Sequence, residues 1–236
     1  MKSTVDEIRA RFDADVERFS NLETGQVAAQ DSAKCMAMIA RAAAAVCPEG
    51  RDLLDIGCGA GNYSLMLLKQ RPGVNVTLVD LSRPMLDRAQ QRVGEATAGS
   101  VNTLQGDVRE VDLGAGRYDW ILAAAVLHHL RSDAEWVDVF TRLHAALRPG
   151  GSLWIYDMVE HESAPVGTMM QSDYGDYLVS LKDAAYRDHV FDYIQQEDTP
   201  RPLTFQMELM RSVGFTNIDV LHKNTCFAAF GGIRTA

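Results

Sequence analysis

Cysteine, proline and long hydrophobic runs are all scarce in this sequence, and each shortage excludes a class of protein. The four cysteines are far apart and form no CxxC pair, so we expect reduced thiols rather than a disulfide framework. Seven prolines and 18 glycines among 236 residues are too few for a collagen-like chain. Neither a run of about 18 apolar residues nor a secretory pattern occurs, so we expect a cytoplasmic protein without a membrane span.

Positive charge is also in short supply. Lysine and arginine total 23 against 32 aspartate and glutamate residues, which leaves a net charge of −9. The resulting field repels phosphate backbones and anionic lipids, so no nucleic-acid or membrane partner is expected. Hydrophobic residues make up 47% of the chain, which suffices for a core that needs no metal or disulfide for stability.

Short apolar runs alternate with helical segments over residues 51–157. This alternation is typical of a parallel α/β sheet with helices on both faces. Ser82 and Ser132 mark two helix starts, and Arg148–Gly151 is expected to end a helix and turn the chain into the last of these strands. The predicted strands are Leu53–Ile56, Val74–Val79, Val101–Leu104, Trp120–Ala123 and Ser152–Tyr156.

Helical segments are predicted on both sides of this region. Residues 1–50 are expected to form a lid of two helices, of which the first has an apolar face. Residues 51–236 then form one domain, with a strongly acidic helical insertion at about 158–200 over the open edge of the sheet. A helix over Leu203–Val213 and two antiparallel strands, Thr216–Leu221 and Cys226–Phe230, complete that edge. The apolar face of the first helix consists of Val5, Ile8, Phe12, Val16 and Phe19.

A glycine-rich turn follows the first predicted strand. Gly57, Gly59 and Gly61 come directly after Asp55, where a sharp turn and a ligand lying against bare backbone both favour glycine. Asp80 ends the next strand, 25 residues after Asp55, at a position where a carboxylate can accept both hydroxyls of a ribose. The GxGxG spacing favours a nucleoside that carries an amino acid over a dinucleotide.

Five motifs follow one another within residues 51–157, namely LLDIGCGAGNYS, VTLVDLSRPML, GDV, YDWILAAAVLHHL and LRPGGSLWIYD. In this order they resemble the motifs of class I S-adenosylmethionine-dependent methyltransferases. The resemblance implies an enzyme with the cofactor S-adenosyl-L-methionine, and a Rossmann-like sheet of seven strands that is mostly parallel with its last strand antiparallel. It also implies cofactor contacts from Asp55, Gly57, Gly59, Gly61, Asp80, Leu81, Asp107, Val108 and Ala123.

Two adjacent histidines follow the fourth predicted strand. Open α/β sheets bind ligands at the carboxyl ends of their strands, so His128 is a candidate catalytic base, with helix capping or packing as the alternative. No cluster of histidine, cysteine and carboxylate residues has ligand spacing, so the sequence assigns no metal site. Further candidates lie in the insertion: Asp173, Tyr174, Tyr177 and His189 for chemistry, and Met169 and Met170 for an apolar acceptor or for core packing.

The sequence narrows the methyl acceptor only to a class. The fourth strand ends in Ala123–Ala125, where enzymes that methylate nucleobase amino groups carry Asn or Asp, then Pro-Pro and an aromatic residue. Together with the negative charge, this favours a small-molecule acceptor held beneath the first helix and the insertion. O-, N- and C-methylation all stay open, as does a homodimer.

Two alternative functions stay open at this point. The segments FDADVERFSNLETGQ and MRSVGFTNIDVLHKNTCFAAFGG are similar to carboxy-S-adenosylmethionine synthase of tRNA wobble-uridine modification. That resemblance implies an arginine that holds the added carboxylate, with Arg187 and Arg201 as candidates. The second alternative is a module that binds the cofactor without turnover, because a fold alone does not establish chemistry.

Overall fold

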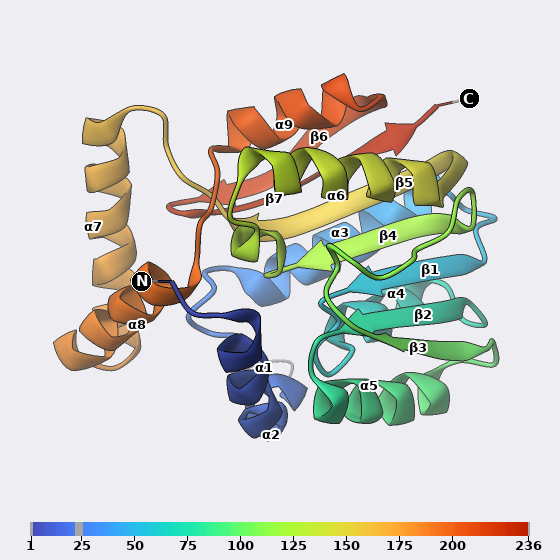
Figure 1. Ribbon diagram of the computed structural model, residues 1–236, viewed down its shortest axis with the longest axis horizontal. Coiled ribbons are helices and arrows are strands. Elements are labelled where there is room, and N and C mark those ends of the chain that lie inside the picture. Colours follow the sequence, from blue (N-terminus) through green and yellow to red (C-terminus); the bar gives the residue numbers. More distant parts are fainter. Residues whose placement is uncertain (1, 22–25, 236) are drawn as a thin grey trace.

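A seven-stranded sheet with helices on both faces forms the centre of the molecule (Figure 1). The computed structural model describes residues 2–21 and 26–235. The strands lie in the order β3-β2-β1-β4-β5-β7-β6. Their bounds are β1 (Asp52–Ile56), β2 (Asn75–Asp80), β3 (Val101–Gln105), β4 (Tyr118–Ala124), β5 (Leu147–Met158), β6 (Phe215–Asn224) and β7 (Phe227–Arg234).

The helices begin where the sequence offers capping side chains. Ser82 accepts the N–H of Met85, and Ser132 forms a capping box with Glu135, as the sequence predicts for these two helix starts. The described helices are α1 (Val5–Ala14), α2 (Val16–Ser20), α3 (Ser32–Val46), α4 (Asn62–Gln70), α5 (Arg83–Ala96), the 3-10 turn η1 (Leu127–His129), α6 (Asp133–Ala146), α7 (Ala164–Leu181), α8 (Ala184–Glu197) and α9 (Leu203–Ser212).

Strand direction confirms the predicted fold class. The strands β3, β2, β1, β4 and β5 pair in parallel, whereas β7 pairs antiparallel with both β5 and β6. Parallel strands need crossover connections, and here α4 connects β1 to β2, α5 connects β2 to β3 and α6 connects β4 to β5, whereas the described residues between β3 and β4 form no helix. The sheet is therefore the mostly parallel, seven-stranded arrangement with a final antiparallel strand that the motif order implies.

Alternate residues of the central strands enter two separate cores. Leu53 of β1 and Trp120 of β4 face the cluster that includes α3, α4 and α5, whereas Leu54 and Ile121 face the cluster that includes α6 and α9. The indole N–H of Trp120 donates to the Ala43 carbonyl of α3 at 2.8 Å. Because α3 packs into this core, the lid expected from residues 1–50 stays a prediction for α1 and α2.

The start of the chain differs from the prediction. The spacing of the apolar residues predicts one continuous first helix, but Asp15 breaks it into α1 and α2. Three helices of the described part of the chain therefore precede the sheet, where the sequence predicts two. The Asp15 N–H bonds the Phe12 carbonyl and leaves the α-helical pattern, with φ −107° and ψ 14°. Periodicity alone does not reveal such a break, because both helices present apolar residues to the same side. Residues 22–25, part of the segment similar to carboxy-S-adenosylmethionine synthase, lie outside the described residues.

The segment Arg148–Gly151 also differs from the prediction. It does not separate a helix from a strand but lies within β5, which begins at Leu147 directly after α6. Leu147 pairs with Tyr118, and the register shifts before Ser152 pairs with Trp120. The positive φ of Gly150, +83°, accommodates this irregularity, so a local turn signal became a bulge within a longer strand.

The predicted insertion is helical, but it lies elsewhere on the sheet. The helices α7 and α8 stand past the carboxyl ends of the strands, beside the N-terminus, rather than over the edge strand β6 (Figure 1). The ring of Tyr174 in α7 lies 5.4 Å from that of Phe227 at the start of β7, and the Tyr177 hydroxyl donates to the Val27 carbonyl at 2.7 Å. None of the described helices has the length and apolar composition needed to span a membrane.

Candidate functional site

A cavity of about 240 Å³ opens at the carboxyl ends of β1, β2 and β4. Open α/β sheets bind their ligands at this end, where the strand order reverses. Here the reversal falls between β1 and β4. The residues predicted to contact a cofactor that line this cavity are Asp55, Gly57, Gly59, Asp80, Leu81, Asp107 and Val108.

The glycine-rich turn forms the floor of the cavity. Gly57 and Gly59 adopt φ +60° and +50°, in the left-handed region that costs least for glycine. A Cβ on Gly57 would stand 2.6 Å from a methyl carbon of Val126, whereas a Cβ on Gly59 would meet no atom within 4 Å. Gly57 is therefore required by packing, and Gly59 leaves open backbone beside the cavity for a ligand.

Asp80 joins the turn to the end of β2. One carboxylate oxygen accepts the Gly59 N–H at 2.8 Å, and the other accepts the Ser82 N–H at 2.9 Å. Burial raises the pKa of Asp80 to about 6, although these backbone hydrogen bonds favour the charged form. The carboxylate lines the cavity and keeps further lone pairs for a hydroxyl donor.

Asp55 fixes the start of α4 from the end of β1. Its carboxylate accepts the Ser64 hydroxyl at 2.6 Å and the Ser64 N–H at 3.2 Å. Complete burial raises the pKa of Asp55 to about 7, because the two bonds from Ser64 offset only part of the desolvation. Asp55 therefore holds the two arms of the glycine turn together in addition to lining the cavity.

Asp107 is paired with an arginine that the sequence analysis did not single out. Arg109 donates to both oxygens of Asp107, at 2.9 and 2.5 Å, and to Glu135 at 3.0 Å. Burial alone would raise the pKa of Asp107, but the hydrogen bonds and charge of Arg109 bring it below its ordinary value. The carboxylate is therefore ionised and oriented at the cavity wall, and Arg109 lines the cavity beside it.

Two predicted cofactor residues lie away from the cavity lining. Gly61, at φ +81°, caps α4, and a Cβ there would stand 3.0 Å from a methyl carbon of Val93. Ala123 is fully buried in the core on the α6 side of the sheet. Ala124 and Ala125, the latter with φ +52°, line the cavity instead. Since side chains alternate along a strand, an error of one position moves a residue from the site into the core.

Of the two adjacent histidines, His129 lines the cavity and His128, the candidate base, does not. His128 lies behind the cavity lining, and its Nδ1 bonds the carboxylate of Asp157. Burial would lower the pKa of His128, but the charges of Asp157 and Asp198 raise it to about 9. His129 lines the cavity, and burial, then the neighbouring His128, lower its pKa. A catalytic role for His128 stays a prediction, but the ring that lines the cavity is that of His129.

The other candidates from the sequence are engaged elsewhere. Tyr174 donates to the Ala28 carbonyl at 2.9 Å, and Arg201 binds Asp133 at 2.8 Å. Arg187 binds Asp188 at 2.7 Å. The candidates of the insertion and the segment after it that do not line the cavity are Met169, Met170, Asp173, Tyr174, Tyr177, Arg187, His189 and Arg201.

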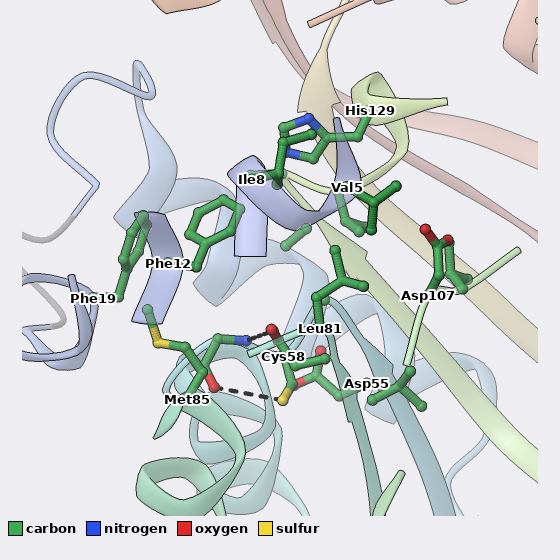
Figure 2. Close-up of a pocket in the computed structure, with 18 of the residues that line it drawn as sticks. Val5, Ile8, Phe12, Phe19, Asp55, Cys58, Leu81, Met85, Asp107 and His129 are labelled. Atoms are coloured by element: carbon green, nitrogen blue, oxygen red, sulfur yellow. Dashed lines mark hydrogen bonds between the residues drawn. The ribbon is translucent and has the colours of Figure 1, made fainter. Parts of the chain in front are cut away.

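The apolar side of the cavity comes from α1 and α2. Figure 2 shows Ile8 and Phe12 facing the hollow opposite Leu81 and Cys58, with Phe19 beside Phe12. Ile8, Phe12 and Phe19 belong to the apolar face that the periodicity predicts for the first helix. An ion pair joins α1 to the end of α8, because Arg11 binds the buried carboxylate of Glu197 at 2.7 Å.

Comparison with known proteins bears on the same region. The family described as a methyltransferase domain matches residues 53–151. Malonyl-[acyl-carrier protein] O-methyltransferase from Paenibacillus sp. (strain JDR-2) is 33% identical over 103 residues, which is 43% of this chain and 36% of that protein. The chain spans about a third to a half of the length of the curated relatives it matches.

Solved structures extend the similarity of fold to the whole chain. The 1,6-didemethyltoxoflavin-N1-methyltransferase of Burkholderia thailandensis, solved with 1,6-didemethyltoxoflavin and S-adenosylhomocysteine, is 20% identical with a TM-score of 0.63. The superposition covers 100% of this chain and 92% of that one. Human N-acetylserotonin methyltransferase in complex with S-adenosylmethionine is 18% identical with a TM-score of 0.64, over 100% of this chain and 63% of that one. At these identities the likeness concerns the fold.

Proposed function

We propose that this chain binds S-adenosylmethionine and transfers its methyl group to a small, largely apolar acceptor. The chain has the class I methyltransferase fold, and residues 53–151 match the methyltransferase domain family. One observation carries the proposal. Three carboxylates, those of Asp55, Asp80 and Asp107, line one cavity beside the open backbone of Gly59. The methyltransferase relatives and the fold of the solved neighbours support it.

The lining residues suit each part of this cofactor. Asp80 offers free lone pairs to the two ribose hydroxyls, and the ionised Asp107 offers an acceptor to the adenine amino group. Leu81 and Val108 supply apolar surface for the faces of the adenine ring. A Cβ is absent at Gly59, so main chain can approach the amino-acid end of the ligand.

The chain's own residues then have two tasks. When bound, S-adenosylmethionine supplies an electrophilic methyl group, so the protein must align a nucleophile and exclude water. Val5, Ile8 and Phe12 of α1 line the cavity and provide an apolar wall for the acceptor. This wall favours an acceptor with aromatic or aliphatic surface over a strongly charged one.

Calorimetry with S-adenosylmethionine, followed by a transfer assay with a radiolabelled methyl group, tests the proposal. We expect one equivalent to bind with micromolar affinity, and label to enter an apolar acceptor from a panel of small phenols, amines and acyl thioesters. NAD serves as the control ligand and should not bind. Binding without transfer to any acceptor would favour the cofactor-binding module, and mass spectrometry of a copurified ligand would reveal a carboxylated cofactor. The absence of binding would refute the proposal.

We expect cofactor binding to weaken in mild acid. A ribose hydroxyl donates to the ionised form of Asp80, whose pKa in the free protein is about 6 because of burial. The part of the pH dependence that Asp80 causes should therefore vanish above about pH 7, and below pH 6 the dissociation constant should rise by up to about tenfold per pH unit, as a proton competes with the ligand.

Calorimetry from pH 5 to pH 8 measures this dependence, with Asp80→Asn as the control. The variant should bind more weakly at pH 8 and lack the rise centred near pH 6. Asp55 is retained in that variant, and burial raises its pKa to about 7, so a remaining dependence should centre near pH 7. Equal profiles for both proteins would show that Asp80 is not the group that titrates.

A further inference from the structure

A second group of chemically capable side chains lies against the cavity wall. His128 and His129 come from η1 after β4, and Asp198 follows α8, about 70 residues later. One oxygen of Asp198, Oδ1, lies 3.5 Å from Nε2 of His128 and 3.4 Å from Nδ1 of His129. All three ligand atoms lie within 4.8 Å of one another. Sequence spacing did not reveal this group, because the insertion separates its members.

These atoms are buried but not satisfied by one another. Oδ1 of Asp198 has no hydrogen-bond partner among the described residues, and the ring of His129 has only a weak contact with the backbone of Glu197. The Asp198 side chain is only 3% exposed and the His129 side chain 16%. Buried polar atoms without partners are costly and call for an explanation, such as a bound ion that the protein atoms alone do not show. Because the three ligand atoms lie within 4.8 Å of one another, a single ion could contact all of them.

The neighbouring charged groups are already engaged. Arg11 binds the carboxylate of Glu197, and Arg131 donates to the Glu197 carbonyl and the Thr199 hydroxyl. Lys2 donates to the backbone carbonyl of Asp198 rather than to its carboxylate. The Oδ1 atom of Asp198 therefore faces the two imidazoles without an arginine or lysine partner among the described residues.

The two distances from Asp198 match those of a tetrahedral transition-metal site. Zinc binds imidazole nitrogen and carboxylate oxygen at about 2.0–2.2 Å, which places two tetrahedral ligand atoms about 3.3–3.6 Å apart. The Asp198 distances of 3.5 and 3.4 Å fall in this range. The alternative is an ion pair between a protonated His128 and Asp198. It would explain the contact of Asp198 with His128 but not its contact with His129.

The surroundings also match a metal site. Metal-binding imidazoles commonly donate their other nitrogen to a carboxylate, which fixes the ring. Nδ1 of His128 bonds Asp157, which leaves Nε2 directed at Asp198. Asp157 is itself fixed by the Leu127 N–H at 2.8 Å and the Met158 N–H at 2.7 Å.

We propose that Nε2 of His128, Nδ1 of His129 and Oδ1 of Asp198 bind a divalent transition-metal ion of the zinc type. Two nitrogen ligands and one carboxylate oxygen favour Zn²⁺ or Co²⁺ over Mg²⁺ or Ca²⁺, which prefer oxygen ligands. The ion joins the end of α8 to the turn after β4, and it lies at the cavity wall because His129 lines the cavity. This site does not depend on the proposed methyl transfer.

Metal binding to the chelator-treated full-length protein tests the proposal. We expect one equivalent of Zn²⁺ in competition with a chromogenic chelator, and intense visible absorption with Co²⁺, as four-coordinate sites produce. Asp198→Asn and His129→Gln should each weaken Zn²⁺ binding at least tenfold, and Asp157→Asn by about 10- to 100-fold through the orientation of His128. The matched control is His189→Gln, because His189 is an exposed histidine of α8 and the change should leave affinity unaltered.

Two outcomes would overturn the proposal. One is the absence of stoichiometric binding to the wild type, and the other is equal affinity in wild type, Asp198→Asn and His129→Gln. If a variant fails to fold, X-ray absorption at the zinc edge of the wild type decides alone, since it must show two imidazoles. Binding of S-adenosylmethionine, measured on the same samples, separates a failed metal site from a failed cofactor site.

Discussion

The Asp80→Ala variant will bind S-adenosylmethionine at least 100-fold more weakly than the wild-type protein. Hydrogen bonds to a charged group contribute about 1.5–3 kcal/mol each, and the proposed ribose contact comprises two of them. Their combined loss corresponds to roughly a hundredfold or more in affinity, since about 1.4 kcal/mol is tenfold. The same change leaves the Gly59 and Ser82 N–H groups without their acceptor, which loosens the turn.

Calorimetry on three proteins checks this prediction. Asp80→Asn keeps the side-chain volume and removes the charge, so it separates lost recognition from a collapsed turn and should fall between the other two in affinity. Asp87→Ala, on the exposed side of α5, serves as the control and should bind like the wild type. A dissociation constant for Asp80→Ala within threefold of the wild-type value would refute the assignment of the ribose contact.

Two alanine substitutions in the glycine turn will differ in their main effect, one on stability and the other on cofactor binding. Gly57→Ala will reduce the free energy of unfolding by about 2–5 kcal/mol, the sum of left-handed strain and of overpacking against Val126. Gly59→Ala meets no atom within 4 Å, so it will cost only the strain of about 1–2 kcal/mol. Its methyl group stands beside the cavity, however, and will weaken cofactor binding at least tenfold.

Gly73→Ala provides the matched control for this pair. Gly73 has φ +82° and open space around it, but it lies on the turn before β2, at the end of the sheet away from the cavity. The variant should lose about 1–2 kcal/mol of stability and bind the cofactor normally. Urea unfolding and calorimetry on all three variants measure both quantities. Normal binding by Gly59→Ala would contradict the proposed approach of the ligand to this backbone.

Local signals in the sequence predicted the sheet, and they also singled out the acidic residues of the candidate site. The run ending at Asp55, the glycines after it and the strand ending at Asp80 are each encoded within a few residues. Parallel strands bring such ends to one edge, so Asp55, Asp80 and Asp107 were predicted to meet at that edge and do line one cavity.

Features that only the folded chain fixes account for what the sequence did not predict. Ala123 was chosen where Ala124 and Ala125 line the cavity, because only the three-dimensional structure fixes which face a strand residue occupies. The pairing of Asp107 with Arg109 depends on a turn that brings side chains two residues apart together. The position of Asp198 beside the histidines depends on how the insertion folds back, and no local pattern encodes that.

The attachment of the first two helices has a consequence for the dynamics of the molecule. Ile8 is the buried residue of α1, and α2 has none. The helix α1 is otherwise attached by polar contacts such as the ion pair between Arg11 and Glu197, which water can replace. Segments with so little buried apolar surface open locally at a small fraction of the global unfolding free energy. Amide hydrogens of residues 5–20 should therefore exchange with solvent long before those of the central strands. A ligand bound in the cavity beneath these residues would slow their exchange more than that of the central strands.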